Sequence, residues 1–279
     1  MPYPLLDPRS TSHEGVNAGA CALAMMIKAP RPGASKTRLS PPLTPEEAAT
    51  ISACFLRDTT ANIAHVVSAH APGGGGAPAA GVAVYTPVGI EAAFDGLLPD
   101  GFVMVSQREE GFGGRLLGAV EDLLAVGYGS VCLIDSDSPT LPAASLAAAV
   151  EVLAQPGDRV VLGPSEDGGY YLIGVKAAHR GLFEDIDWST DRVTPQTLER
   201  AALLGLEVIQ LPTWYDVDDR ATLHSLCDEL FGGTSTRAQA GGYPAPRTRE
   251  FLAGLLASEG RTRLWPDAPQ DTTTPPVSV

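Results

Sequence analysis

The sequence predicts one α/β domain, a Rossmann-like three-layer α/β/α sandwich with a mostly parallel sheet. Short apolar runs alternate with longer helical segments along most of the chain, and this alternation is typical of a buried parallel sheet covered by helices on both faces. The chain has 279 residues, of which 44% are hydrophobic. That is enough for one sizeable core and too little for two full domains, so we expect one main domain.

The first strand and the first helix carry the clearest local signals. Residues 21–27 (CALAMMI) form a short apolar run before a basic loop with proline and glycine, which favours a buried strand over a helix. Thr44 is a good N-cap, Pro45 suits the first helical position and Glu47 completes a capping box, so a helix is expected from here to about Val67. Further strands are expected at residues 81–85, 102–105, 131–134, 160–162 and 206–211, an additional and more exposed strand at 168–176, and helices at 114–125, 143–153 and 247–258.

Three segments are expected to lie outside the main domain or to interrupt it. Residues 1–18 are polar, contain proline and lack periodicity, which predicts a flexible N-terminal tail. The glycine-rich residues 71–80 predict a flexible connector without a chemical role. The main domain is expected over residues 19–232. Residues 233–279 are expected to form a C-terminal extension with one short helix and a disordered tail beyond Trp265.

Composition excludes several classes of protein. The formal net charge of −14 argues against a protein that coats nucleic acid or an anionic membrane, because both require a positive surface. No run reaches the roughly 18 to 20 apolar residues of a membrane-spanning helix, and the N-terminus lacks a signal-peptide pattern, so a cytoplasmic protein is expected. The four cysteines are widely spaced and are expected to be buried thiols.

A basic loop follows the first predicted strand. Its cations are Lys28, Arg31, Lys36 and Arg38, and Gly33 lets the backbone approach a ligand closely. Ligands of an open parallel sheet bind outside the carboxyl ends of the strands, so these cations are placed to contact the phosphates of a diphosphate together. The alternative interpretation is a basic loop that is merely solvated.

Two acidic loops follow other predicted strands. Asp135 and Asp137 come directly after the strand at 131–134, and side chains at i and i+2 of an extended backbone point the same way. Both carboxylates could therefore approach one Mg²⁺ or Mn²⁺ ion that bridges phosphate oxygens. Asp216 is predicted as an additional metal ligand, while Asp218 could instead cap a helix. Capping of the helix near Pro142 is the structural alternative for the first pair.

Two further segments combine glycine with polar residues. The predicted nucleotide contacts in the first of these segments are Gln107, Gly111, Gly114 and Arg115, although turn formation explains the glycines equally well. Glu166 and Asp167 are candidates for general-base work or acceptor binding. Residues 188–190 (WST) could line an acceptor pocket, with simple packing of Trp188 as the alternative. The predicted catalytic residues are Asp135, Asp137, Lys36 and Asp167.

Taken together, these motifs resemble the nucleotide-diphospho-sugar transferase superfamily, whose members share the GT-A fold. They are closer still to its bacterial branch known as domain of unknown function 2064, often labelled glycosyltransferase. The segments that carry the resemblance are IKAPRPGASKTRL, LTPEEAA, FLRD around Asp58, QREEGFGGRL, LIDSDSPTLP, LGPSEDGGYYLIG, DIDWSTDRV and WYDVDD. They span roughly residues 21–230.

The resemblance implies a nucleotide bound across the first strands and a metal held by the D-x-D motif, Asp135 and Asp137. For a sugar transferase it also implies that the acceptor approaches from the side of the DGGYY and DWST segments. The segments KTRL, GFGGRL, DSDSP and DGGYYLIG also resemble, more distantly, the guanylyltransferases that activate phospholactate or phosphoenolpyruvate. Those enzymes have a glycine-threonine-asparagine segment after the DGG-like turn, and Tyr170-Tyr171-Leu172 stands here instead. That departure weakens the likeness to nucleotidyl transfer.

Three functions therefore remain open from sequence. The first is a metal-dependent glycosyltransferase that moves a sugar from a nucleotide-sugar donor to a small or lipid-like acceptor. The second is a nucleotidyltransferase that activates a small phosphorylated metabolite with a nucleoside triphosphate and releases pyrophosphate. The third is a nucleotide-binding regulator without turnover. The sequence does not specify the donor sugar, the base, the acceptor, the stereochemical outcome or the oligomeric state.

Overall fold

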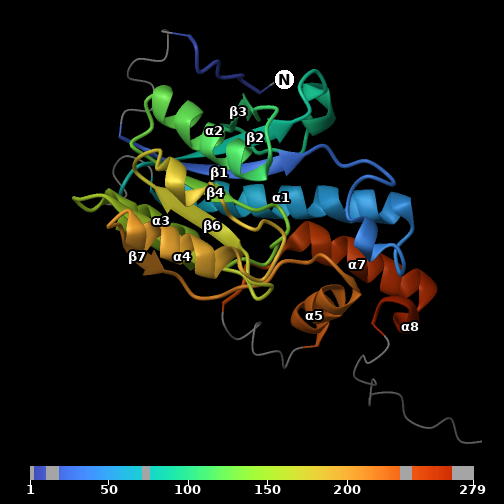
Figure 1. The fold of residues 1–279 in the computed structure, drawn as a ribbon. Coiled ribbons are helices and arrows are strands. Elements are labelled where there is room, and N and C mark those ends of the chain that lie inside the picture. Colours follow the sequence, from blue (N-terminus) through green and yellow to red (C-terminus); the bar gives the residue numbers. More distant parts are fainter. Residues whose placement is uncertain (1–2, 11–18, 71–75, 233–240, 266–279) are drawn as a thin grey trace, which may run out of the picture.

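A seven-stranded sheet forms the centre of the molecule, and its strand order is not the order of the sequence (Figure 1). The computed structural model describes residues 3–10, 19–70, 76–232 and 241–265. From one edge to the other the strands are β3 (Val103–Ser106), β2 (Ala79–Thr86), β1 (Cys21–Lys28), β4 (Ser130–Ile134), β6 (Tyr170–Val175), β5 (Arg159–Pro164) and β7 (Glu207–Gln210). All the pairings are parallel except those of β6. The predicted fold class is confirmed.

Helices bury apolar side chains against both faces of the sheet. One core contains residues from α1 (Pro45–Ala69), α3 (Ala143–Ala154), α5 (Arg220–Phe231), α7 (Pro246–Glu259) and α8 (Arg261–Leu264). The other contains residues from α2 (Phe112–Ala125) and α4 (Val193–Leu203). Short 3₁₀ turns lie at η2 (Thr37–Leu39), η3 (Glu91–Phe94) and η4 (Arg180–Leu182). Among the residues that the structure describes, no helix combines the length and hydrophobicity needed to cross a bilayer. All four cysteines are buried and free, as predicted.

The predicted start of α1 is confirmed in detail. Thr44 Oγ1 accepts a hydrogen bond from the backbone nitrogen of Glu47 (3.2 Å), and the Glu47 carboxylate accepts one from the backbone nitrogen of Thr44 (2.8 Å). Pro45 occupies the first turn, where its missing N–H costs nothing. The long helix that follows packs beside β1 and β2 and ends at Ala69.

The strand β6 differs from its prediction. The sequence suggested an additional, exposed strand, but residues 171–175 are buried between β4 and β5, antiparallel to both. Its apolar side chains contribute to both cores, which explains a continuous apolar run instead of alternation. Because β6 runs the opposite way, its first residues lie beside the last residues of β4. The backbone nitrogen of Asp135 accordingly donates to the carbonyl of Tyr171 (3.0 Å).

The described part of the N-terminal segment is anchored to the sheet. The backbone nitrogen of Leu6 donates to the carbonyl of Met104 (2.8 Å), and the nitrogen of Met104 donates to the carbonyl of Pro4 (2.9 Å). The hydroxyl of Tyr3 donates to the carbonyl of Leu98 (2.7 Å). The expectation of a flexible tail is therefore not met at residues 3–10. Residues 11–18, the linker residues 71–75 and the tail beyond Trp265 lie outside the described residues.

The C-terminal extension packs on α1 through a buried carboxylate. Asp58 is 0% exposed and accepts hydrogen bonds from the backbone nitrogens of Arg247 (3.0 Å) and Thr248 (2.8 Å). These N–H groups belong to the first turn of α7, where a helix cannot satisfy its own donors. Asp58 lies in the FLRD segment that contributes to the resemblance. Its side chain, on α1, caps the N-terminus of α7.

Replacing Asp58 with alanine is expected to lower the free energy of unfolding by about 2–4 kcal/mol. The substitution leaves one buried and one partly buried N–H group without an acceptor, and a buried group of this kind costs about 1–3 kcal/mol. Urea denaturation measures the loss. The matched control is Glu46→Ala, because Glu46 is exposed in the first turn of α1, the helix that contains Asp58. Equal stability of the Asp58→Ala and Glu46→Ala proteins would contradict the capping role.

Candidate functional site

Four loops meet at one end of the strands, where the parallel strands have their carboxyl ends and β6 begins. They are the basic loop after β1, the DSDS loop after β4, the SEDGG turn between β5 and β6, and residues 214–218 after β7. The backbone nitrogen of Val217 donates to the carbonyl of Asp137 (2.9 Å), and that of Glu166 donates to the carbonyl of Trp214 (2.9 Å). Backbone hydrogen bonds therefore hold the acidic loops together, as expected for a ligand site of an open α/β sheet.

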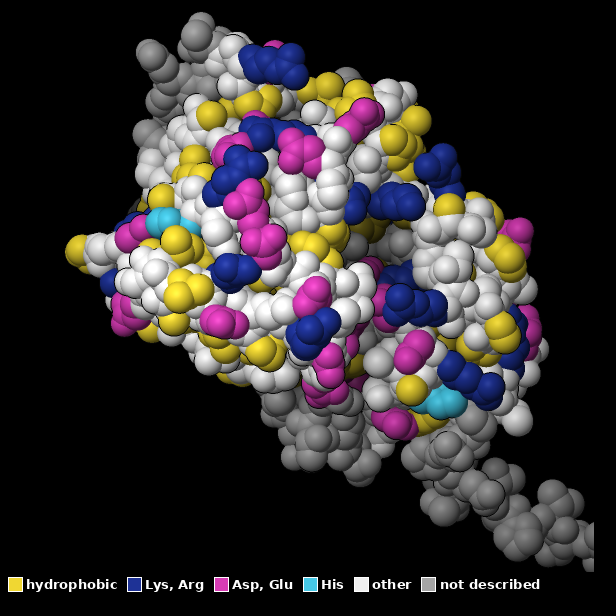
Figure 2. All heavy atoms as spheres, viewed as in Figure 1, with side chains coloured by type: hydrophobic (Ala, Val, Ile, Leu, Met, Phe, Trp, Pro, Cys, Tyr) yellow, Lys and Arg dark blue, Asp and Glu magenta, His cyan; other side chains and the backbone are white. Residues whose placement is uncertain are grey.

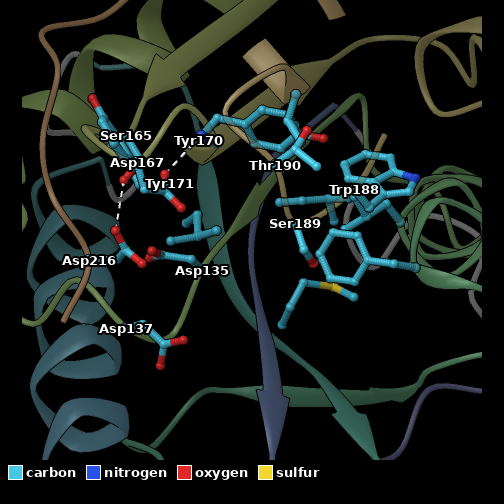
Figure 3. A pocket seen from close by; sticks show the side chains of 17 residues that line it. Asp135, Asp137, Ser165, Asp167, Tyr170, Tyr171, Trp188, Ser189, Thr190 and Asp216 are labelled. Atoms are coloured by element: carbon cyan, nitrogen blue, oxygen red, sulfur yellow. Dashed lines mark hydrogen bonds between the residues drawn. The ribbon is translucent and has the colours of Figure 1, made fainter. Parts of the chain in front are cut away.

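Carboxylates from three of these loops face one pocket (Figure 3). They are Asp135 and Asp137 after β4, Asp167 in the SEDGG turn, and Asp216 after β7. Ser165 donates a hydrogen bond to Asp216 Oδ1 (3.0 Å), and the backbone nitrogen of Gly169 donates to Asp167 Oδ1 (2.8 Å). Burial, followed by the charges of Asp167 and Asp218, raises the pKa of Asp216.

Asp135 is the most deeply buried of these acids. Its Oδ2 accepts a hydrogen bond from Ser138 (2.8 Å), but its buried Oδ1 has no hydrogen-bond partner among the residues that the structure describes. Burial raises the pKa of Asp135 well above its ordinary value, and the charges of Asp137 and Asp216 act in the same direction. A buried carboxylate oxygen without a partner is costly, so this atom is placed to gain most from a bound cation or donor.

Lys36 joins the basic loop to the acidic loops. Its Nζ lies 2.8 Å from Asp137 Oδ1 and 2.6 Å from Asp218 Oδ1, and its side chain is only 7% exposed. The residue adopts a left-handed backbone conformation (φ 48°) just before η2, which turns its side chain back toward the sheet edge. Burial alone lowers the pKa of Lys36, but Asp137 and Asp218 outweigh it and the pKa is raised. The ammonium group therefore stays charged.

The structure corrects the interpretation of Asp218 as a helix cap. Asp219 caps α5, since its side chain accepts a hydrogen bond from the backbone nitrogen of Thr222 (2.9 Å). Asp218 instead contacts Lys36 and lies 3.7 Å from a nitrogen of Arg38. Adjacent aspartates in an Asp-Asp pair look equivalent in sequence, so only the helix start distinguishes the cap from the site residue.

Two adjoining pockets share Asp137. The basic pocket, of about 270 Å³, has Lys28, Ser35, Lys36, Arg38, Asp137 and Asp218 among its lining residues. The acidic pocket, of about 220 Å³, combines the four carboxylates Asp135, Asp137, Asp167 and Asp216 with an apolar part that includes Phe112, Leu116, Tyr170 and Trp188. Figure 3 shows the carboxylates at one end of the acidic pocket and Trp188 at the other. Cations and acids far apart in the chain therefore meet at one rim, as the sequence predicted.

Several predicted nucleotide contacts do not line either pocket. They are Arg31, Gly33, Gln107, Gly111, Gly114 and Arg115. The Gln107 amide donates to the carbonyls of Ile27 (3.2 Å) and Val84 (2.8 Å). Gly111 is the N-cap of α2, and the Arg115 guanidinium stacks near the Phe112 ring at 5.5 Å. The glycines of this segment therefore belong to the start of a helix, which is neither the predicted nucleotide contact nor the turn that was its alternative.

Some residues of the acidic pocket were not among the site residues predicted from sequence. Phe112 and Ser165 were not named for the site, and simple packing was the alternative for Trp188. Phe112 carried a usable signal, because it is a large apolar residue next to glycines just before a predicted helix. Tyr170 lies in the DGGYY segment that the resemblance places on the acceptor side, but its position in the pocket depends on where β6 lies in the sheet.

The donor chemistry of the acidic pocket fits a hard divalent cation, although no complete ligand set is preformed. Within the described ranges, no group of three or more His, Cys, Asp or Glu side chains is arranged to hold a metal ion. Mg²⁺ usually takes one or two carboxylates together with water and substrate phosphates. The unpartnered oxygen of Asp135 and its neighbouring carboxylates match that requirement.

The face of the molecule drawn in Figure 2 carries no large basic patch. On the face drawn in Figure 2, basic and acidic side chains are interspersed and no continuous basic surface is visible. An anionic ligand would therefore have to be met locally, and the basic pocket brings Lys28, Lys36 and Arg38 together.

Known proteins similar to this chain agree with its fold. The family described as "Uncharacterized protein conserved in bacteria (DUF2064)" matches residues 77–190. No curated protein matches the chain. A crystal structure from Desulfovibrio desulfuricans G20, inferred to be a nucleotide-diphospho-sugar transferase, is 26% identical with a TM-score of 0.71 and is aligned over 86% of this chain and 96% of its own length.

Two other solved structures are similar at lower TM-scores. A CMP:2-keto-3-deoxy-manno-octonic acid synthetase complexed with CTP is 12% identical, with a TM-score of 0.46 over 75% of this chain and 97% of its own. A glucosyl-3-phosphoglycerate synthase from Mycobacterium tuberculosis, solved with Mn²⁺, UDP and phosphoglyceric acid, is 13% identical, with a TM-score of 0.43 over 91% of this chain and 80% of its own. The resemblance inferred from the motifs is confirmed: the chain matches the DUF2064 family over residues 77–190 and shares the α/β fold of an inferred nucleotide-diphospho-sugar transferase, which supports an enzyme of the transferase class.

Proposed function

We propose that the chain is a glycosyltransferase that moves a sugar from a nucleotide-sugar donor to a hydroxyl-bearing acceptor, with Mg²⁺ or Mn²⁺ as cofactor. The observation that carries the proposal is the shared wall at Asp137, with a cationic pocket on one side and an acidic, partly aromatic pocket on the other. A donor diphosphate in the basic pocket and an acceptor in the acidic pocket are then neighbours, which is the arrangement that group transfer requires.

The basic pocket is assigned to the diphosphate. Lys28, Lys36 and Arg38 line it, and Lys36 is held by two carboxylates before any ligand arrives. When the bond between sugar and diphosphate breaks, its electron pair leaves with the diphosphate. Fixed cations stabilise that developing charge without having to reorganise.

The acidic pocket is assigned to the metal and the acceptor. Asp135, Asp137 and Asp216 are the residues that would hold the metal, which when bound would neutralise charge on the leaving diphosphate. Asp167 lies in the same pocket and has one carboxylate oxygen held by the backbone of Gly169. As the acceptor oxygen bonds to the sugar, a carboxylate in this position can take the hydroxyl proton.

The charge of the acidic pocket favours glycosyl transfer over nucleotidyl transfer to a phosphorylated metabolite. Four carboxylates line that pocket, and no Lys or Arg is among its described lining residues. One divalent cation offsets only two of up to four carboxylate charges, so the further negative charge of a phosphorylated acceptor would still be repelled in this space. A neutral hydroxyl compound avoids that cost.

A thermal-shift screen of nucleotides with and without Mg²⁺ or Mn²⁺ tests the proposal. Nucleoside diphosphates and nucleotide sugars are expected to raise the Tm by roughly 5–10 °C at about 100 times their Kd, with a larger shift when metal is present. Incubation with nucleoside triphosphates together with phosphorylated metabolites as acceptors is expected to release no pyrophosphate. Pyrophosphate release, together with stabilisation by triphosphates alone, would replace glycosyl transfer by nucleotidyl transfer.

A further inference from the structure

We infer that the acceptor is an uncharged hydroxyl compound whose apolar ring lies against an aromatic wall formed by Phe112, Tyr170 and Trp188. The inference rests on the proposed function, because it identifies the class of molecule that enters the acidic pocket. At about 220 Å³, the pocket is smaller than the roughly 300–1,000 Å³ of typical drug-sized sites. It therefore has room for about one ring of the acceptor, with the remainder outside.

The aromatic wall comes from three separate segments. The ring centroids of Phe112 and Trp188 lie 5.0 Å apart at 66°, and those of Tyr170 and Trp188 lie 6.3 Å apart at 80°. These are edge-to-face contacts, in which the edge of one ring meets the face of the other, so the opposite face of each ring is not used by the contact. The Arg115 guanidinium lies over the Phe112 ring at 5.5 Å and covers part of it. Phe112 is 49% exposed although it is a large apolar residue. An apolar ligand would explain that exposure, because it would cover the ring.

The wall is held in place before a ligand binds. A Cβ atom at Gly113 would lie 2.3 Å from the carbonyl oxygen of Phe183 and 2.9 Å from the Trp188 indole nitrogen. Because glycine has no Cβ, the loop that carries Trp188 packs directly on α2. A Cβ at Gly168 would lie 2.4 Å from Asp191 Cα, so the same loop also packs closely on the SEDGG turn. A wall fixed in this way loses little conformational entropy when a ligand binds.

Two polar features of the pocket specify the rest of the acceptor. The Tyr170 hydroxyl is buried and has no hydrogen-bond partner in the described part of the chain, so a ligand hydroxyl that reached it would supply the missing partner. The carboxylates at the opposite end accept hydrogen bonds and repel anions. A compound with hydroxyl groups and no negative charge satisfies both ends of the pocket.

The experiment compares three small probes that separate the ring from the charge. Phenyl β-D-glucoside has an apolar ring and no charge, methyl β-D-glucoside lacks the ring, and phenyl phosphate has the ring with a negative charge. Ligand-detected NMR titrations of the full chain give the three affinities. Phenyl β-D-glucoside is expected to bind about tenfold more tightly than either of the other probes.

Trp188→Ala tests the wall itself. It is expected to weaken phenyl β-D-glucoside binding about tenfold, the size of an aromatic contact of about 1.4 kcal/mol, and to leave methyl β-D-glucoside binding unchanged. Trp188→Phe should restore most of the loss. The matched control is Trp265→Phe, because Trp265 is a buried residue of the C-terminal extension that donates to Asp228 (2.6 Å). This control should bind all three probes as the unaltered protein does.

Three results would overturn the inference: equal affinity for phenyl phosphate and phenyl β-D-glucoside, no detectable binding of phenyl β-D-glucoside, or unchanged affinity in Trp188→Ala. Titrations with UDP, GDP, ADP and CDP in the presence of Mg²⁺ on the same samples separate this failure from failure of the proposed function. If one of them binds and the probes behave otherwise than expected, only the acceptor class is wrong. If no nucleoside diphosphate binds, the glycosyltransferase proposal itself fails.

Discussion

Replacing Lys36 with alanine is expected to weaken the binding of nucleoside diphosphates roughly 10- to 100-fold. A hydrogen bond to a charged group contributes about 1.5–3 kcal/mol, and Lys36 offers such a bond from a nearly buried position. Calorimetric titration with nucleoside diphosphates measures the change. The remaining cations Lys28 and Arg38 line the same pocket, so binding should be weakened and not abolished.

Two companion variants make the result specific. Asp218→Asn removes one of the two carboxylates that hold Lys36, and a loss of only a few-fold is expected because the Asp137 contact remains. Lys176→Ala is the matched control. Lys176 lines a small pocket with Cys21 and Ser130, the first residues of β1 and β4. It therefore lies at the end of the strands opposite the candidate site. Equal losses from Lys36→Ala and Lys176→Ala would mean that general charge, and not the basic pocket, attracts the nucleotide.

Replacing Asp137 with alanine is expected to remove the metal-dependent part of the nucleotide thermal shift while leaving the fold intact. Loss of a carboxylate beside the cation is expected to weaken the response to Mg²⁺ or Mn²⁺ by about two orders of magnitude. The backbone carbonyl of Asp137 still accepts the hydrogen bond from Val217, so the two acidic loops remain joined. Thermal shifts recorded with and without metal measure the effect.

The change at Asp137 also frees Lys36, so a control must separate the two consequences. Asp218→Asn serves this purpose, because it removes the other partner of Lys36 without altering the predicted metal ligands. The metal-dependent shift should survive in Asp218→Asn and disappear in Asp137→Ala. A metal response that persists in both proteins would rule out Asp137 as a ligand.

Much of the site could be predicted because its chemistry is local in sequence. Lys36, Asp137 and Asp216 each follow a strand that could be recognised from a short apolar run. Parallel strands end at the same edge of a sheet, so the convergence of their loops followed from the fold class alone. The sequence did not reveal that Lys36 would contact Asp218, which lies 182 residues away.

The glycine-rich segment at 107–115 shows where local reasoning fails. Its polar and glycine residues suit a nucleotide contact as well as a helix start, and the structure uses Gly111 as the N-cap of α2. The Gln107 amide is occupied by strand carbonyls. Such a choice depends on which groups lie nearby after folding, and a single sequence does not contain that information.

The sequence by itself determined the layered α/β fold, the capped start of α1 and the residue types at the ends of the strands. These follow from hydrophobic period, capping chemistry and charge, which act between near neighbours in the chain. Only the tertiary structure decided that β6 lies buried between β4 and β5, that Asp218 and not Asp219 contacts Lys36, and that Trp188 lies beside Phe112 in one wall of the pocket. These contacts join residues far apart in the chain, and the competition among possible partners is resolved only when the whole core packs.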